Sequence, residues 1–458
     1  MKNRIFHTFL LTAIVMIMLY ALSWLPKMEV FGFETRPVDL LADIRPDENA
    51  DQEVDVANAV TADGLRNYDM PIQGNIQPIE DYSWNKANAG LYVGHGMGYF
   101  YDSLDKVKTL GRPVRIAYFG DSFIEGDILT QDLRGLLQNR FGGAGVGFVD
   151  IESPTANFRV SVRATSKGWN AYSVTDKSGF DAGRQGIAER YFIPRGTAQV
   201  QMEGNAAMKA QHQDSWDVTT LYYRAPHHVT VTGQLNDGDV QSLAIGGSAE
   251  VQKVQLTGNA EKTAWMIPDG SGIFFGISLE SSWGISLDNF SMRGNSGMTL
   301  AKIPEATLAQ FASVRPYDLI VLQFGLNVAN CNQVNYADYE REMENVVRKL
   351  GAAYPKASIL IVGVGDRGER KGGRIATMRG IKELGRFQQQ VAFKTGCSFW
   401  NLYQGMGGAG SIAKMADSKP AMANKDYTHI NVKGGQFVAQ RLFDALMAGY
   451  DERKGKNK

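Results

Sequence analysis

Short apolar runs recur along the chain, and most of them precede a segment with helical periodicity. Such runs occupy Val114–Phe119, Asp318–Phe324, Ala357–Val364 and Ser398–Tyr403. The first three are continuous rather than alternating, as in parallel strands that helices cover on both faces. The pattern therefore predicts an α/β sandwich whose active loops lie at the carboxyl ends of its strands.

Between residues 151 and 290 the helical periodicity disappears, and strand-like segments take its place. Trp216–Ala225 is rich in β-branched and aromatic residues, and Asn236–Gly238 indicates a tight hairpin. So many short strands predict a β-sandwich inserted at 151–290. The α/β domain is then divided into a first part, 83–150, and a second part, 291–450.

The N-terminus carries a long apolar stretch, Ile5–Leu25, with no charge beyond one histidine. As a helix it would measure about 31 Å, close to the thickness of a bilayer core. Lys2 and Arg4 precede it, which favours a cytoplasmic N-terminus and export of the remainder. We expect an uncleaved membrane anchor over residues 1–33, with the catalytic domain outside the cytoplasm. A cleaved signal peptide ending before Trp24 is the alternative.

Composition narrows the class of protein. Of the 458 residues, 44% are hydrophobic and 21% are charged, which is typical of globular domains. Lys plus Arg equals Asp plus Glu at 48 each, so no charge bias favours a nucleic acid partner. The polar, acidic stretch 34–82 predicts a tether, and 451–458 a basic tail. Cys331 and Cys397 lack metal-type spacing, and the sequence leaves their pairing undecided.

Ser122 stands at the abrupt end of the first apolar run, and two interpretations compete for it. A serine between a strand and a helix is often an N-cap, whereas the same position lets nearby N–H groups stabilise an oxyanion. Asp426 and His429, three residues apart before the last helical segment, supply the missing partners of a nucleophile. We therefore predict that His429 is the general base for Ser122 and that Asp426 orients it.

Two further residues follow other strands of the predicted sheet. Gly297 lacks a side chain and could bring a backbone N–H close to a substrate carbonyl. Asn327 could offer its side-chain amide as another donor. The alternatives are a turn glycine and a left-handed asparagine. With the N–H of Ser122, these two groups form the predicted oxyanion hole.

Taken in order, these stretches resemble the four sequence blocks of the SGNH, or GDSL-like, hydrolases. The blocks read GDSF with Ser122, GNSG with Gly297, GLN with Asn327, and DYTH with Asp426 and His429. The resemblance implies a flavodoxin-like, three-layer α/β/α domain and a serine hydrolase that needs no metal or organic cofactor.

Two positions depart from the family pattern. Phe123 replaces the leucine of the first block, and Val328 replaces the aspartate that often follows the asparagine. Neither change removes a catalytic group. The insert at 151–290 is similar in its placement to the carbohydrate-binding-like insert of bacterial peptidoglycan O-acetylesterases, a likeness of architecture alone.

The resemblance implies an exported serine esterase that removes O-acyl groups, most plausibly acetyl, from a cell-envelope or other glycan such as peptidoglycan. Two alternatives remain open at this point. An O-acetyltransferase would pass the acyl group to a glycan hydroxyl and could be supplied by a membrane acyltransferase. A non-catalytic glycan-binding protein would rely on the insert, although the intact Ser122, Asp426 and His429 argue against it.

Overall fold

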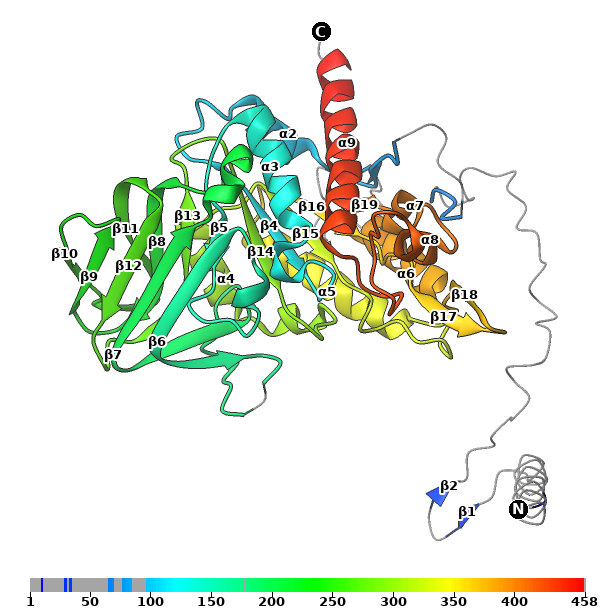
Figure 1. Ribbon diagram of the computed structural model, residues 1–458, viewed down its shortest axis with the longest axis horizontal. Helices are drawn as coiled ribbons and strands as arrows, with labels where there is room; N and C mark the ends of the chain where they lie inside the picture. Colours follow the sequence, from blue (N-terminus) through cyan, green and yellow to red (C-terminus); the bar gives the residue numbers. More distant parts are fainter. Residues whose placement is uncertain are drawn as a thin grey trace, which may run out of the picture. The chain divides into compact units, whose positions relative to one another are not determined.

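The computed structural model describes residues 10, 29–30, 33–34, 65–69, 76–84, 96–176 and 178–456. Its contacts divide the chain into two units, Met1–Val56 with Arg370–Ile375 and Ala57–Glu369 with Ala376–Lys458. In the first, β1 (Glu29–Val30) and β2 (Phe33–Glu34) form an antiparallel pair. The second carries all of the predicted chemistry, and the fold described below is that of this unit alone (Figure 1).

A six-stranded sheet forms the centre of this unit. In spatial order its strands are β14 (Ile285–Ser291), β4 (Val114–Gly120), β15 (Leu319–Gln323), β16 (Ser358–Val362), β19 (Ser398–Trp400) and β3 (Glu80–Asp81). The first five are parallel, and β3 is antiparallel to β19. All residues of β4, β15 and β16 are buried, which accounts for the continuous apolar runs.

Strand register brings three strand ends together at one edge of the sheet. Gly120, the last residue of β4, lies level with Ser291 of β14 on one side and Gln323 of β15 on the other. A Cβ at Gly120 would lie 2.8 Å from the side chain of Ile124 and 3.0 Å from the carbonyl oxygen of Gln323. A glycine is therefore required where the chain turns out of the sheet towards Ser122.

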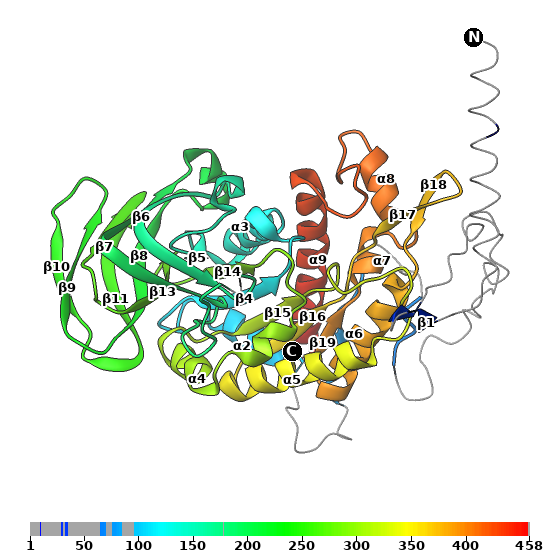
Figure 2. The ribbon, with the colours of Figure 1, turned by 90° about the horizontal axis from the view of Figure 1, so that it is seen from below.

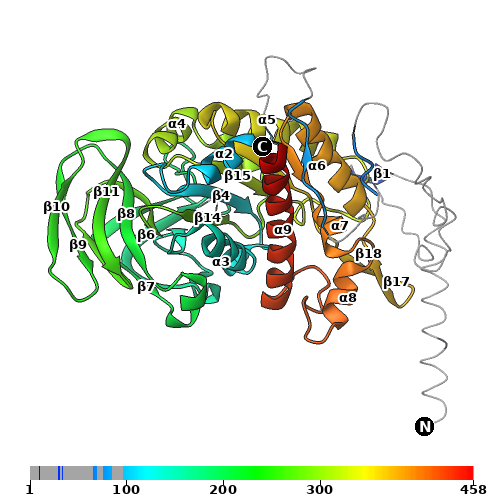
Figure 3. The ribbon, with the colours of Figure 1, turned by 90° about the horizontal axis from the view of Figure 1, so that it is seen from above.

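Helices cover both faces of this sheet, which gives the three layers that the sequence predicted (Figures 2 and 3). The helices are α2 (Gly98–Asp105), α3 (Thr130–Phe141), α4 (Glu305–Val314), α5 (Ala337–Ala353), α6 (Ile381–Thr395), α7 (Leu402–Met406), α8 (Ser411–Asp417) and α9 (Val432–Lys456). Helices α3 and α9 pack together on one face, and α4, α5 and α6 lie on the other. The α/β part of the predicted fold is confirmed.

Nine antiparallel strands follow between the first and second parts of the α/β sheet. They are β5 (Gly147–Val149), β6 (Val162–Ser173), β7 (Arg190–Gly204), β8 (Trp216–Ala225), β9 (Val229–Leu235), β10 (Gln241–Ile245), β11 (Ser248–Ala260), β12 (Lys262–Ile267) and β13 (Ile273–Glu280). In spatial order, seven of these strands run β10-β9-β12-β7-β13-β8-β11. Strands β7 and β13 are paired through a single pair of facing residues, Phe192 and Phe274. The buried side chains of these strands form a core of their own.

A buried ionic cluster joins this β region to the parallel sheet. Arg315 contacts Asp288 of β14 at 2.6 Å and Glu280 of β13 at 3.0 Å, and Arg115 of β4 contacts Glu280 at 2.8 Å. Burial raises the pKa of Glu280, but the two arginines outweigh it and hold that pKa well below its usual range. Because an unpaired charge here would be strongly destabilising, the cluster specifies how β13 sits against the sheet.

Three predicted boundaries need correction. Leu65, Tyr68 and Tyr82 are buried in the main core, so the described end of the predicted tether 34–82 is part of the fold. The segment is polar on average, so its composition did not indicate that these few apolar residues are buried. At the other end of the insert, β14 belongs to the parallel sheet although most of it lies before residue 290, because a strand pattern does not reveal which sheet a strand joins.

The predicted basic tail 451–458 is also wrong for most of its length. Helix α9 continues to Lys456. The side chain of Arg453 donates a hydrogen bond of 2.6 Å to the carbonyl of Gly98, and Lys454 lies 4.5 Å from the ring of Tyr450. These contacts place the basic residues of the predicted tail on a helix that packs against the domain.

The membrane anchor over residues 1–33 and the localisation derived from it are corrected. Within the ranges given above, the structure contains no helix of sufficient length and apolar character to cross a membrane. The stretch Ile5–Leu25 on which the prediction rested lies outside the described residues, except for Leu10. A hydropathy pattern reports apolar length, and that alone does not establish a spanning helix.

Candidate active site

Ser122 lies in a turn and caps no helix. The residues after β4 form a turn and then the short 3₁₀ helix η2 (Glu125–Asp127), and α3 begins only at Thr130. The N-cap positions are Ile124 and Leu129, neither of which makes a side-chain cap. The N-cap interpretation of Ser122 is therefore excluded by the backbone.

The side chain of Ser122 contacts His429, and His429 contacts Asp426. Ser122 Oγ lies 3.0 Å from His429 Nε2, and His429 Nδ1 lies 2.8 Å from Asp426 Oδ2. An ionised carboxylate only accepts hydrogen bonds, so Nδ1 carries the proton and Nε2 is free to accept one from the serine. The three residues form a hydrogen-bonded chain with the polarity that nucleophilic catalysis requires.

Asp426 is held by its own loop. Its Oδ1 accepts hydrogen bonds from the backbone N–H groups of Thr428, at 2.9 Å, and His429, at 3.0 Å. Burial raises the pKa of Asp426, but hydrogen bonds from the backbone and ring of His429 outweigh it, so this pKa lies below its usual value. The loop is closed by an isolated bridge between Ala423 and Ile430 and by Tyr427 at φ 53°. This local geometry lets a three-residue spacing supply both base and carboxylate.

Asp121, next to the serine, is buried and was not singled out in the sequence. Its Oδ1 accepts a hydrogen bond of 2.9 Å from the backbone N–H of Phe123. Burial raises its pKa to about 6, against backbone hydrogen bonds and the nearby His429, which lower it. The backbone groups that bond it include those of Gly325 and Leu326, so Asp121 connects the serine turn to the loop after β15.

Gly297 and Asn327 both belong to the loops at the shared sheet edge, and both already have partners. Gly297 has φ 88°, and a Cβ there would lie 2.6 Å from the ring of Phe324. Its N–H donates to Asn295 Oδ1 at 2.8 Å, while Asn327 Nδ2 donates to the carbonyl of Asn295 at 3.0 Å. Asn327 is not among the left-handed residues of the described chain, so that alternative for it is excluded.

Asn295 is another residue of this site that the sequence analysis missed. It lies inside the GNSG block, where only the glycine was considered, and it is buried. Its side chain also donates a hydrogen bond of 2.7 Å to Glu189, which precedes β7. No local signal in the sequence pairs residues 106 positions apart, so only the tertiary structure reveals this contact.

A cavity of about 630 Å³ is lined by Glu125, three residues after Ser122, and by residues of the β region, and Ser122 is not part of its lining. Glu125 of η2 and Arg293 of the loop after β14 form an ion pair at its wall. Phe158 and Tyr172, from the β region, line it as well, and Phe158 is two-thirds exposed. A polar rim with exposed apolar surface is typical of a site for a small organic group.

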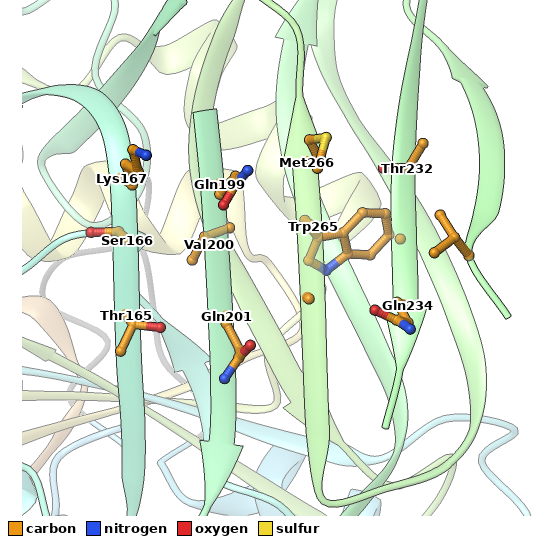
Figure 4. A pocket seen from close by; sticks show the side chains of 13 residues that line it. Thr165, Ser166, Lys167, Gln199, Val200, Gln201, Thr232, Gln234, Trp265 and Met266 are labelled. Carbon is orange, nitrogen blue, oxygen red and sulfur yellow. The ribbon is translucent and has the colours of Figure 1, made fainter. Parts of the chain in front are cut away.

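A second hollow, of about 270 Å³, lies on the outer face of β6, β7, β12 and β9 (Figure 4). Strand register arranges its side chains in two rows: Thr165, Gln201, Ala264 and Gln234, and next to it Lys167, Gln199, Met266 and Thr232. Ala264, the smallest side chain, forms its floor between two glutamines. We call this surface the amide groove.

The residues between 151 and 290 include four tryptophans. Trp169, Trp216 and Trp265 are buried in the core of the β region, and Trp283 is exposed but lies against Gly142.

The described ranges hold no group of three or more His, Cys, Asp or Glu side chains placed to bind a metal ion. Cys331 and Cys397 are free thiols.

Comparisons with protein-family models and with curated proteins give no match. Among solved structures, a peptidoglycan O-acetylesterase matches with a TM-score of 0.65 and 21% identity, covering 82% of this chain and 99% of that one. A family two carbohydrate esterase from Cellvibrio japonicus matches with a TM-score of 0.25 and 11% identity, covering 63% and 99%. The first likeness establishes the fold, and the resemblance to SGNH hydrolases holds at that level.

Proposed function

We propose that this chain is a serine esterase that removes O-acyl groups, and acetyl in particular, from a glycan. The observation that carries the proposal is the hydrogen-bonded chain from Ser122 through His429 to Asp426 at the carboxyl edge of a parallel sheet. The substrate class is supported by analogy, because the structure with the same fold is a peptidoglycan O-acetylesterase.

The proposed reaction begins when Ser122 Oγ attacks the ester carbonyl and His429 Nε2 takes the hydroxyl proton. Asp426, which accepts a hydrogen bond from Nδ1 of His429, stabilises the imidazolium that forms. The tetrahedral intermediate then expels the sugar oxygen, which leaves as a hydroxyl with the proton from His429. Water, deprotonated by the same imidazole, attacks the acyl-serine; as the bond to Ser122 Oγ breaks, the imidazolium returns the proton to that oxygen and the carboxylic acid is released.

The oxyanion needs donors at the serine side of the sheet edge. Asn327 has two amide hydrogens and donates one to Asn295, so the other remains for the substrate. The single N–H of Gly297 is engaged by Asn295 Oδ1, so its predicted role requires that bond to be shared or broken. In our proposal Asn327 and the N–H of Ser122 are therefore the primary donors.

The activity itself is tested by incubating the full chain with a small acetyl ester and with O-acetylated peptidoglycan, and quantifying released acetate. We expect acetate from both substrates. Absence of acetate release, with acetyl groups appearing on an added glycan hydroxyl, would assign the acyl-enzyme to a transferase instead. If neither acetate nor an acetylated glycan is formed, the proposed esterase function is rejected.

Replacing Asn327 by alanine should lower kcat by about 10² to 10³, the typical loss for one oxyanion donor. KM for a small ester should stay nearly unchanged, because the charge that Asn327 stabilises exists only in the transition state. Steady-state kinetics would separate the two parameters. An increase in KM at constant kcat would show that Asn327 binds substrate and does not stabilise the oxyanion.

The amide groove is our proposed contact for more distant parts of a glycan chain. Its glutamines and threonines can donate to and accept from hydroxyl groups, and the exposed Met266 and Val240 offer apolar contact to the faces of sugar rings. Binding energy made there would raise kcat/KM for a polymer and leave a small ester unaffected.

Ala264→Arg should fill the groove, because this side chain lies on the outer face opposite Gln201 and Gln234. We expect kcat/KM for O-acetylated glycan to fall by about tenfold or more, equivalent to about 1.4 kcal/mol of binding energy, with unchanged turnover of a small acetyl ester. Thr230→Arg, on the same face but outside the groove, is the control. Equal losses on both substrates, or no loss on the polymer, would reject the groove.

A further inference from the structure

Asn295 connects both predicted oxyanion loops, and each of its polar groups has a partner. Its Oδ1 accepts from the N–H of Gly297 at 2.8 Å and from the hydroxyl of Thr299 at 3.0 Å. Its backbone carbonyl accepts from Asn327 at 3.0 Å, and its Nδ2 donates to Glu189 Oε2 at 2.7 Å. Asn295 therefore holds the Gly297 loop through its side-chain amide and Asn327 through its backbone carbonyl.

Glu189 belongs to the β region, not to the sheet that carries the serine. It directly precedes β7, is buried, and has φ 57°, a conformation that residues other than glycine rarely adopt. Two backbone hydrogen bonds hold it there: its N–H donates to Gly186 and its carbonyl accepts from Val174, both at 3.1 Å. A strained, buried acid that is held this firmly is a candidate for a functional constraint.

The chemistry of the two side chains makes the arrangement directional. An amide has one accepting oxygen and one donating nitrogen, whereas an ionised carboxylate only accepts. Glu189 therefore requires Nδ2 of Asn295 to point towards it, which leaves Oδ1 for the N–H of Gly297. With the amide reversed, its NH₂ group would oppose that N–H, and two donors would face each other.

We propose that Glu189 is a positioning residue for the acyl-transfer site, contributed by the β region, and that it fixes Asn295, whose Oδ1 holds the Gly297 loop and whose backbone carbonyl holds the oxyanion donor Asn327. This inference rests on the proposed esterase function. It also implies that the β region takes part in the chemical step for every substrate, and not only in binding a polymer.

Glu189 keeps the Asn295 amide in one orientation whether its own carboxyl group is ionised or protonated. Burial raises its pKa to about 7, while the hydrogen bond from Asn295 and the charges of Arg190 and Lys302 lower it. The protonated acid keeps a carbonyl oxygen that can accept from Asn295, so the amide orientation survives as the pH falls through neutrality. A glutamine at this position retains the same acceptor.

A reciprocal exchange tests the proposal. Asn295→Asp places a second carboxylate 2.7 Å from that of Glu189, and two such groups cannot both ionise without repulsion. We expect kcat for a small acetyl ester to fall by about 10²-fold at pH 8, comparable to the loss of one oxyanion donor. The loss should lessen as the pH decreases and the pair takes up a proton, while KM stays nearly unchanged.

Glu189→Gln should retain most of the activity, and combining it with Asn295→Asp should restore kcat to within about tenfold of the wild-type value, because the glutamine NH₂ then donates to the new carboxylate. Asp181→Asn, an exposed acid on the same β6–β7 connection, is the matched control. A double variant as slow as Asn295→Asp, or an Asn295→Asp variant with wild-type kcat, would overturn the positioning role.

Two measurements keep these outcomes separate from misfolding and from failure of the function. Thermal unfolding of each variant shows whether it folds. If Asn295→Asp does not fold, Glu189→Leu, which leaves Nδ2 of Asn295 without its acceptor, should lower kcat by about tenfold or more at constant KM; wild-type kcat in that variant contradicts the proposal. If Ser122→Ala is fully active, the proposed function itself fails, whatever the other variants show.

Discussion

Ser122→Ala should abolish ester hydrolysis while leaving the fold intact. Removing such a serine lowers kcat by roughly 10⁶-fold in a serine hydrolase that uses this chemistry. The residual rate would come from the remaining oxyanion donors and from substrate binding. Within the part of the chain that the structure describes, the side chain of Ser122 forms a hydrogen bond with His429 alone, so the free energy of unfolding should change by less than about 1.5 kcal/mol.

The measurement is acetate release from a small acetyl ester, with thermal unfolding as the test of folding. The Ser122→Ala variant also distinguishes an enzyme from a glycan-binding protein. If the variant no longer releases acetate but still binds O-acetylated glycan, Ser122 is the nucleophile of an esterase. Normal turnover by this variant would falsify the mechanism.

Asp426→Asn should be the next most damaging change. We expect kcat to fall by about 10⁴-fold, as it does when the aspartate of a comparable triad is replaced by asparagine. The asparagine Oδ1 can still accept from the N–H groups of Thr428 and His429, so the loop should keep its shape. Its NH₂ group, however, would face Nδ1 of His429 and favour the tautomer that carries a proton on Nε2. That tautomer cannot accept the proton of Ser122.

Asp417→Asn is a suitable control for Asp426→Asn. Asp417 is an exposed acid at the end of α8, paired with Lys425 of the same loop, and it has no contact with the histidine among its described interactions. A loss smaller than about tenfold in Asp426→Asn would show that another group orients His429.

The pKa of Asp426 also limits how activity depends on pH. Because this pKa lies below its usual value, the carboxylate stays ionised in mild acid, and its contribution is lost only as the pH falls through that lowered value. A decline in rate between about pH 5 and 6 must therefore come from another group. A pH profile of kcat/KM tests this, since such a decline should persist in the residual activity of Asp426→Asn if another group causes it.

The Asp426–His429 pair could be predicted because its geometry is local. Three residues separate the two side chains, and the backbone N–H groups that hold Asp426 belong to the same turn. The same holds for the sheet, since β4, β15 and β16 are buried along their whole length and so appear as continuous apolar runs. The predicted membrane anchor is not borne out within the described residues, which contain no helix able to span a membrane, and the apolar stretch on which it rested lies outside them except for Leu10.

Sequence alone therefore determined the parallel sheet, the order of its functional loops and the residue types of the candidate triad, because each depends on local pattern and short spacing. The tertiary structure decided which distant residues meet. Ser122 reaches His429 across 307 positions, and Asn295 reaches Glu189 across 106. The orientation of a buried amide depends on the donors and acceptors that packing brings around it, and no periodicity along the chain encodes that arrangement.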